Sequence, residues 1–240
     1  MPQFRKLTRS FEMFVLSLMD TSPAQAATRD RIFAAAERLF AEHGFSPVSL
    51  RQITSEARVN LAAVNYHFGS KEALYCELLR PRLRTLNEER LTSLTQAEQL
   101  AGDQPVPLPA ILESYFRPLL RRAADPAGGG LHFLRLVGGA LTQPPLFLRE
   151  DLTKEIEPVT TRYTRALAEV LSGLPSAELF WRMQFAVGAM VFAALRQHDI
   201  ERLSGGLCRS DDPDDCLRRL VTFCAAGLGA PAAPAPSVRA

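Results

Sequence analysis

The segment from Ser49 to Lys71 reads SLRQITSEARVNLAAVNYHFGSK and contains the residues whose types and spacing are most suggestive of chemistry. Ser49 is followed three residues later by Gln52, the capping-box arrangement that starts a helix. Asn60 is a good N-cap for a second helix, Leu61 to Tyr66. Two short helices joined by a tight turn are what a helix-turn-helix requires, so the segment predicts contact with double-stranded DNA.

The second short helix is predicted to enter the major groove. Leu61 and Val64 can supply packing, whereas Ala62, Ala63 and Asn65 are short enough for the helix to enter a groove roughly 12 Å wide. We expect Asn60, Ala62 and Asn65 to lie nearest the base edges. The residues predicted at or near the bases are Asn60, Leu61, Ala62, Ala63 and Asn65.

Groups flanking these helices suit phosphates, whose contacts position a protein on DNA without reading the sequence. A lone histidine is usually structural, and His43, His132 and His198 are interpreted in that way. His67 differs because it stands between Tyr66 and a Phe-Gly-Ser-Lys run at the end of the reading helix. The predicted phosphate contacts are Ser49, Arg51, Tyr66, His67 and Lys71.

Helices on both sides must position this segment. From Thr28 onward apolar residues recur at helical spacing, and Gly44 stands where a helix ends in a left-handed residue. Ser70 caps a long helix that we expect to end at about Leu91. The first helix has the apolar stripe Ile32, Ala35, Ala36, Leu39 and Phe40.

The rest of the chain is predicted to be helical as well, so the fold class is all-α. An N-terminal three-helix helix-turn-helix domain over 28–74 is followed by a C-terminal helical bundle over 75–230. A flexible extension, 1–27, and an Ala/Pro-rich disordered tail, 231–240, flank them. Pro158 should kink its helix or delay the start. The helices of the second domain are expected at 111–120, 131–141, 149–171, 176–197 and 212–228.

The composition bounds the class of protein. With 47% hydrophobic and 22% charged residues the chain is globular, and a net charge of +2 excludes a broad basic field. The stretch from Met183 to Leu195 is apolar except for Gln184, but it is too short to span a membrane. We therefore expect a cytoplasmic protein without a membrane partner.

Enzyme chemistry finds little support. The chain has no G-x-S-x-G elbow, no H-E-x-x-H and no phosphate-binding glycine loop ending in Gly-Lys-Ser/Thr. Its four cysteines include no C-x-x-C pair, so we expect neither a metal nor a cofactor. The first residues resemble a short signal peptide interrupted by Glu12, and Met13 or Met19 is an alternative start to Met1.

Residues 28 to about 80 resemble the N-terminal domain of the TetR/AcrR family of bacterial regulators. Arg58 departs from the family pattern, which usually has glycine in the turn, and an arginine with positive φ carries strain. The resemblance rests on Ala35-Ala36, Leu39-Phe40, Gly44-Phe45, Ser49-Leu50-Arg51-x-Ile53, Val59 and the run from Tyr66 to Leu74.

This resemblance implies a ligand-responsive, DNA-binding transcriptional regulator. In the family the C-terminal domain binds a small molecule, and its last two helices form a four-helix bundle in a homodimer. Repression at a pseudo-palindromic operator, relieved by the ligand, is the implied outcome. Residues 59–71 and 181–189 are also similar to the subgroup typified by PsrA, a regulator of fatty-acid metabolism, so a fatty acid or its acyl-coenzyme A thioester is an implied effector.

Aromatic residues spread over several helices are candidates for an apolar ligand cavity. Each by itself is better explained as ordinary core. Arg135 and Arg182 lie on otherwise apolar helices, where each can meet a carboxylate or form a surface salt bridge. The pocket candidates are Tyr115, Phe116, Phe133, Arg135, Phe147, Tyr163, Trp181 and Phe185.

The last two predicted helices are candidates for the dimer interface. Three alanines on the first of them make a strip that lets a partner helix approach closely. A helical-bundle interaction protein without sequence-specific DNA binding is the alternative, and it leaves the short reading helix unexplained. The interface candidates are Ala186, Ala189, Met190, Ala193, Leu217, Leu220, Val221 and Cys224.

Overall fold

The computed structural model describes residues 23–125, 130–142, 144–209 and 212–232, and within these ranges it contains helices and turns but no strand. The predicted all-α fold is confirmed. The chain forms two compact units, Met1–Tyr75 and Cys76–Ala240. Most of the predicted N-terminal extension, and all but two residues of the predicted C-terminal tail, lie outside the described residues.

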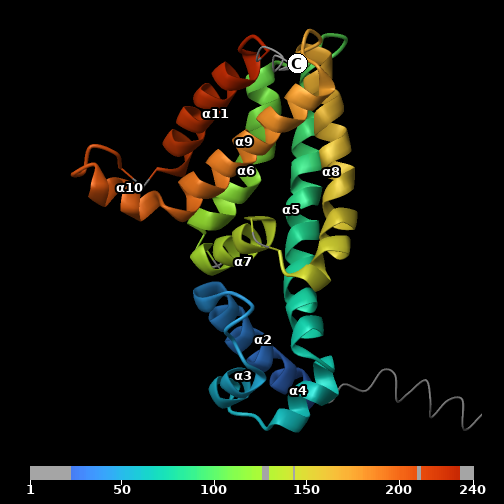
Figure 1. Ribbon diagram of the computed structural model, residues 1–240, viewed down its shortest axis with the longest axis vertical. Helices are drawn as coiled ribbons and strands as arrows, with labels where there is room; N and C mark the ends of the chain where they lie inside the picture. The colour runs from blue at the N-terminus through green and yellow to red at the C-terminus, as the bar shows by residue number, and fades with distance from the viewer. Residues whose placement is uncertain (1–22, 126–129, 143, 210–211, 233–240) are drawn as a thin grey trace, which may run out of the picture. The chain divides into compact units, whose positions relative to one another are not determined.

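The first unit contains α2 (Pro23–His43), α3 (Leu50–Ala57) and α4 (Leu61–Phe68), shown in blue to cyan in Figure 1. Helix α2 packs against both of the others, and its predicted apolar stripe is buried. The helix begins five residues before Thr28, so residues 23–27, predicted to be flexible, are helical. Proline is well tolerated in a first helical turn, and the Ala-Gln-Ala-Ala run after Pro23 favours helix.

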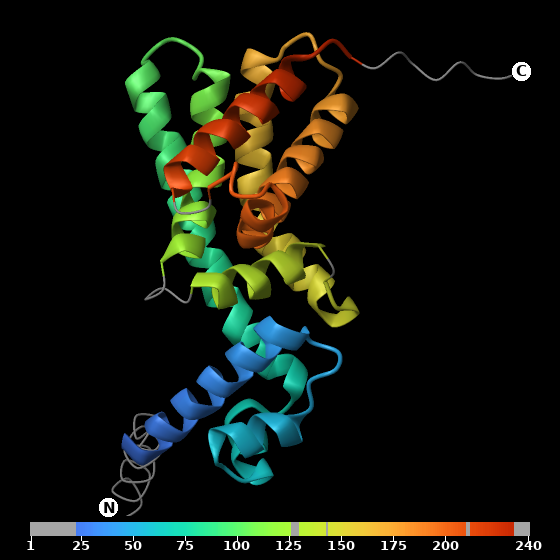
Figure 2. The same cartoon turned by 90° about the vertical axis from the view of Figure 1, so that its left-hand side faces the viewer.

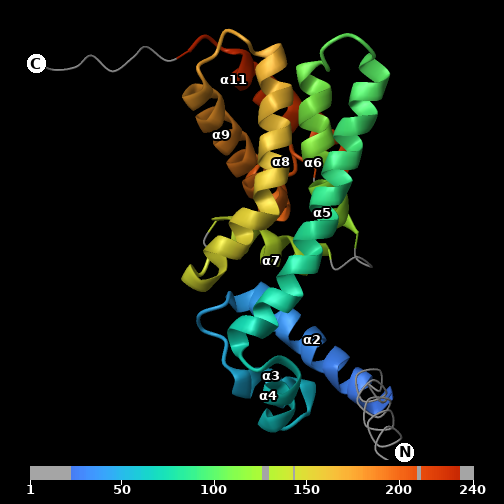
Figure 3. The same cartoon turned by 90° about the vertical axis from the view of Figure 1, so that its right-hand side faces the viewer.

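The second unit is a helical bundle. Helix α6 packs against α7, α8 and α11, and α9 packs against α7, α8 and α11 (Figures 2 and 3). The α5 helix begins in the first unit and continues in the second. The elements are α5 (Lys71–Ala101), α6 (Leu108–Ala124), α7 (Gly130–Thr142), η1 (Leu146–Leu148), α8 (Arg149–Val170), α9 (Ser176–Leu195), α10 (Gln197–Leu203) and α11 (Pro213–Gly229).

One predicted helix end is wrong, because α5 continues about ten residues beyond Leu91. Helix α8 starts at Arg149 as predicted, and Pro158 lies inside it without delaying that start. An internal proline costs about 3 kcal/mol because it lacks an N–H and its ring crowds the preceding turn. In α5, Leu79 and Leu83 are buried on either side of Pro81. The stabilisation from burying such leucines outweighs the cost of the proline within the helix.

Helix α9 also requires a correction. Over its full length it is long and apolar enough to cross a membrane, judged by length and composition only. Our expectation that it is too short rested on the Met183–Leu195 stretch alone. Within the bundle, one side of α9 is buried through Leu179, Met183, Ala186 and Met190. Its other side is exposed and includes Trp181, Phe185 and Phe192. An exposed apolar side of this kind is suited to binding a partner.

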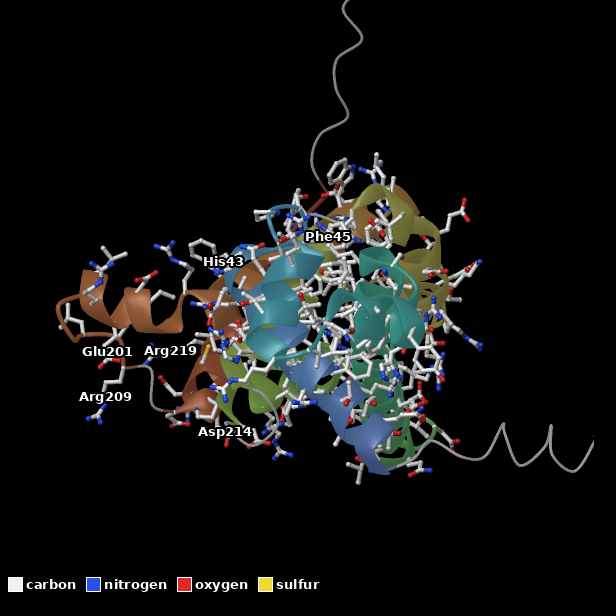
Figure 4. The ribbon with its side chains drawn as sticks, turned by 90° about the horizontal axis from the view of Figure 1, so that it is seen from below. His43, Phe45, Glu201, Arg209, Asp214 and Arg219 are labelled. Carbon is white, nitrogen blue, oxygen red and sulfur yellow. The ribbon has the colours of Figure 1, made fainter. Side chains whose placement is uncertain are left out.

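The chain between α9 and α11 contains the short helix α10, which the sequence did not predict as a separate element. Helix α9 ends at Leu195 rather than Gln197, and Arg196 forms the junction. In Figures 1 and 4 α10 projects from the bundle, with Glu201 on the helix and Arg209 in the chain that follows it. Its leucines, Leu203 and Leu207, are exposed.

Candidate nucleic-acid interface

Both short helices of the first unit are capped as the sequence predicts. The Ser49 hydroxyl accepts the backbone N–H of Gln52 at 3.3 Å, and the Gln52 side-chain oxygen accepts the backbone N–H of Ser49 at 2.8 Å. The Asn60 side-chain oxygen accepts the backbone N–H of Ala63 at 2.8 Å, which caps α4. These bonds satisfy amides that the first helical turn leaves without intrahelical partners.

The turn between α3 and α4 depends on Arg58. This residue has φ 53° and ψ 51°, and it is the one non-glycine residue with positive φ in the described part of the chain. A left-handed conformation costs an L-residue about 1–2 kcal/mol. The backbone N–H of Val59 donates to the carbonyl of Thr54 at 3.0 Å, so the turn is closed by hydrogen bonding in spite of that strain.

Helix α4 has one buried side and one exposed side. Val64 and Phe68 are buried against the rest of the unit. Leu61 was expected to pack, but it is 42% exposed and so belongs to the outer side. The Tyr66 side chain is 75% exposed. The exposed candidates on α4 and at its cap are Asn60, Leu61, Ala62, Asn65 and Tyr66, whereas Ala63 and His67 are half-buried.

Lys71, a predicted phosphate contact, is held against the loop before α3 in the structure. Its ammonium donates to the carbonyl of Phe45 at 3.1 Å and to the carbonyl of Val48 at 2.8 Å. It also lies 4.1 Å from the centroid of the Phe45 ring. Because an ammonium has three donors and these neighbours engage it, we interpret Lys71 as a clamp on the loop before α3. Two other predicted phosphate contacts, Ser49 and Arg51, are exposed at the start of α3.

Arg29 on α2 is a candidate that the sequence analysis missed. Its guanidinium carbon lies 4.5 Å from the Phe33 ring centroid and 5.6 Å from that of Phe68. Phe68 ends α4 and its ring is next to that of His67. The side chain therefore adds a cation beside the end of α4. The sequence indicates only that Arg29 and Phe33, four residues apart, lie on the same side of α2. The packing of α2 against α4 is what places Arg29 near Phe68.

The second unit contains a cavity between α7, α8 and α9. Its outer chamber has a volume of about 580 Å³ and its lining includes Leu141, Ile156 and Phe180. An inner chamber of about 130 Å³ shares these three residues and reaches Tyr115 and Tyr163. Threonines of α8 add hydroxyl groups to a largely aliphatic lining, as in a site for a small amphipathic molecule. They are Thr153, Thr160, Thr161 and Thr164.

Of the predicted pocket residues, the structure brings only Tyr115 and Tyr163 to this cavity. Phe116 and Phe133 are fully buried in the bundle and line neither chamber. The spacing of the aromatic residues in the sequence did not show which of them would lie in the core, line the cavity or face solvent. Aromatic residues in all three environments recur at helical spacing. The candidates Arg135, Phe147, Trp181 and Phe185 lie exposed, away from both chambers.

Arg182 does not line the cavity between α7, α8 and α9, and its contacts extend beyond the predicted surface salt bridge. The side chain is buried, and its guanidinium donates to the carbonyls of Leu228 at 2.7 Å and Pro231 at 2.7 Å. It also donates to Glu178 at 2.9 Å, one turn earlier on α9. Arg182 therefore binds the carboxyl end of α11, whose last carbonyls have no intrahelical partners.

The predicted interface residues lie on the expected helices, and most of them are buried against the rest of the second unit. Six are buried within the chain itself and two are half-buried, although Ala186 and Cys224 also line a groove between the two helices. The buried six are Ala186, Met190, Leu217, Leu220, Val221 and Cys224, and the half-buried two are Ala189 and Ala193.

The exposed aromatic face consists of Trp181, Phe185 and Phe192 on α9 and Phe223 on α11. These side chains are between 61% and 72% exposed. Trp181 and Phe185 stack with ring centroids 5.9 Å apart. Phe185 and Phe223 line one groove of about 200 Å³ between the two helices. Large aromatic side chains gathered on one face mark a site of protein–protein contact.

Comparison with known proteins gives matches at both ends of the chain. The family model for bacterial regulatory proteins of the tetR family matches residues 32–78, and the model for a tetracyclin repressor-like C-terminal domain matches residues 113–227. The HTH-type transcriptional repressor NicS of Pseudomonas putida is 36% identical over 61 residues, 25% of this chain and 29% of that protein.

Other similar proteins agree with these matches. The probable acrEF/envCD operon repressor of Escherichia coli K12 is 38% identical over 68 residues, 28% of this chain and 31% of that protein. The chain thus spans about a third of the length of the curated relatives it matches. The solved structure of the fatty acid degradation regulator FadR from Bacillus halodurans has the same fold, with a TM-score of 0.57, 15% identity and coverage of 92% of this chain and 98% of that one.

The two family models follow one another in the order in which the structure places its helix-turn-helix and its helical bundle. Together they span most of both compact units. The chain belongs to the TetR family of bacterial regulatory proteins.

Proposed function

We propose that this protein is a ligand-responsive, DNA-binding transcriptional repressor that acts by binding alone, without catalysis. The observation that carries the proposal is the outer side of α4. A capped helix of eight residues presents Ala62, Asn65 and Tyr66 to solvent. Asparagine can hydrogen-bond an adenine edge, and alanine contacts a thymine methyl group. The family model for bacterial regulatory proteins of the tetR family matches residues 32–78, which include α4, and the similar proteins include two that are named as repressors.

The proposal includes a homodimer formed through the exposed aromatic face. Two copies would set two reading helices about 34–36 Å apart, or a multiple of that spacing, on a pseudo-palindromic operator. Four exposed aromatic side chains on α9 and α11 support this arrangement, because burial in a partner removes them from water.

The proposed effector binds in the cavity of the second unit. Its aliphatic and threonine lining suits a fatty acid or the acyl part of a coenzyme A thioester, as in the PsrA-like subgroup to which we assign the chain. Helix α5 belongs to both compact units and is the element through which we propose that ligand alters DNA affinity. We place the protein in the bacterial cytoplasm, where its operator is.

The test is binding to the DNA upstream of the protein's own gene and to random DNA, at several salt concentrations. Asn65→Ala and Tyr66→Ala should each weaken operator binding about tenfold or more, the usual cost of losing a good base or phosphate contact. Gln99→Ala, at an exposed amide of α5 in the second unit, is the matched control. Equal affinity of all three variants and the wild type, or no preference for operator, would favour the helical-bundle interaction protein instead.

A further inference from the structure

The second unit contains a buried cation that the proposed function does not yet use. Arg90 on α5 is 3% exposed. Its Nε donates to the carbonyl of Tyr115 at 3.0 Å, and its Nη1 donates to the side-chain oxygen of Asn87 at 3.3 Å. The guanidinium carbon lies 3.9 Å from the centroid of the Tyr115 ring. All of these acceptors are uncharged.

No carboxylate of the described residues forms an ion pair with Arg90. Among the acidic side chains of α5 around it, Glu88 is exposed to solvent, Glu89 pairs with Arg122 and Glu98 pairs with Arg162. On the neighbouring α8, the Glu155 carboxylate pairs with Arg84 at 3.1 Å. Burying a guanidinium is costly unless a counter-ion compensates, so this arrangement is unusual for a charge with a purely structural role.

The least satisfied edge of the guanidinium faces α9. Its Nη2 has only the thioether sulfur of Met190, at 4.0 Å, and sulfur is a weak acceptor. Met190 lies one helical turn from Val187, which lines the inner chamber together with Tyr115 and Tyr163. The Tyr163 hydroxyl donates to the carbonyl of Arg90 at 2.8 Å. Two walls of the inner chamber are therefore in direct contact with Arg90.

We propose that the effector is a free amphipathic carboxylic acid whose carboxylate pairs with Arg90 at the inner end of the cavity. The inference rests on the proposed ligand site and names its ligand class. The carboxylate takes the Nη edge in place of the Met190 sulfur, while the Tyr115 ring keeps the face of the guanidinium. The aliphatic part occupies the outer chamber along Leu141 and Ile156. A thioester carbonyl has no charge to offer Arg90, so the free acid is the preferred form.

Isothermal titration calorimetry on the full chain, with decanoate, methyl decanoate and 1-decanol as probes, tests this assignment. The wild type should bind decanoate at least about tenfold more tightly than either neutral probe, as expected for a buried charge-assisted pair. Arg90→Met should remove that preference and leave the affinity for 1-decanol unchanged. Arg135→Gln, at an exposed arginine of α7 outside the cavity, should behave as the wild type does. Arg90→Gln serves the same purpose if the methionine variant does not fold.

Three results overturn the inference: equal wild-type affinity for acid and alcohol, an acid preference that survives Arg90→Met or Arg90→Gln, or loss of the preference in Arg149→Gln at the outer chamber. Operator binding measured on the same samples keeps the two proposals apart. Selective DNA binding without an acid preference refutes only the ligand assignment. An acid preference without selective DNA binding refutes the repressor and leaves the carboxylate site in place.

Discussion

Lys71 shows how the role of a single side chain depends on residues distant in the sequence. Its ammonium lies against the carbonyls of Phe45 and Val48, more than twenty residues earlier in the chain. Those carbonyls belong to the loop that joins α2 to α3, and no helical partner can satisfy them there. Their hydrogen bonds to a charged donor fix the loop, and with it the start of α3 at Leu50.

Lys71→Met should therefore act on stability more than on DNA contact. We expect the free energy of unfolding to fall by about 1–3 kcal/mol, because the substitution leaves half-buried carbonyls without a charged donor. Urea unfolding followed by circular dichroism measures the change.

Arg51→Met provides the contrast at an exposed arginine on α3. It should change the free energy of unfolding by no more than about 0.5 kcal/mol, yet lower the salt dependence of DNA binding by about one counterion. If Lys71→Met altered only the salt dependence of DNA binding and Arg51→Met destabilised the fold, Lys71 would be the phosphate contact and Arg51 the structural residue.

At the scale of elements, the end of α11 is held by a side chain of α9. Arg182 binds carbonyls of the last turn of α11 and of the two residues that follow it, and Glu178 supports the guanidinium. The carboxyl end of a helix has partial negative charge, so a buried cation there is favourable. This contact links the two helices that present the exposed aromatic face.

Arg182→Met should lower the free energy of unfolding by about 2–3 kcal/mol, since it leaves buried carbonyls unpaired and removes a charge-assisted contact. Hydrogen exchange should locate the loss at the end of α11. Arg165→Met is the control, because Arg165 forms an exposed ion pair with Glu169 on α8 and such pairs are worth about 0–1 kcal/mol. Similar destabilisation by the two substitutions would mean that Arg182 does not hold α11.

At the scale of the whole molecule, α9 and α11 together expose four large aromatic side chains on one face. The side chains opposite them on these helices are buried within the bundle. A chain that acts alone gains nothing from this arrangement, whereas two copies placed face to face would bury it.

Phe185→Glu should convert a dimer to a monomer, because it places a carboxylate at the centre of the exposed aromatic face. Light scattering coupled to size exclusion measures the mass. Leu100→Glu is the matched control, since Leu100 is 90% exposed and lies on α5 rather than on α9 or α11. A monomeric wild type, or a Phe185→Glu variant that remains dimeric, would remove α9 and α11 as the interface.

The sequence by itself determined the features that depend on neighbours within a few residues. The capping box at Ser49, the cap at Asn60 and the buried stripe of α2 are all found as predicted. Their causes are local, because hydrogen bonds and steric limits between residues up to four apart decide them. The all-helical class follows from the same short-range pattern.

Only the tertiary structure decided which apolar face is buried and which charge is paired. From Met183 to Leu195 helix α9 is apolar except for Gln184, so periodicity does not distinguish the buried Met190 from the exposed Phe185. The contact of Arg90 with Tyr115, and the binding of α11 by Arg182, join residues 25 to 49 positions apart. Such pairings depend on how whole helices pack against one another, and a one-dimensional pattern carries no information about that packing.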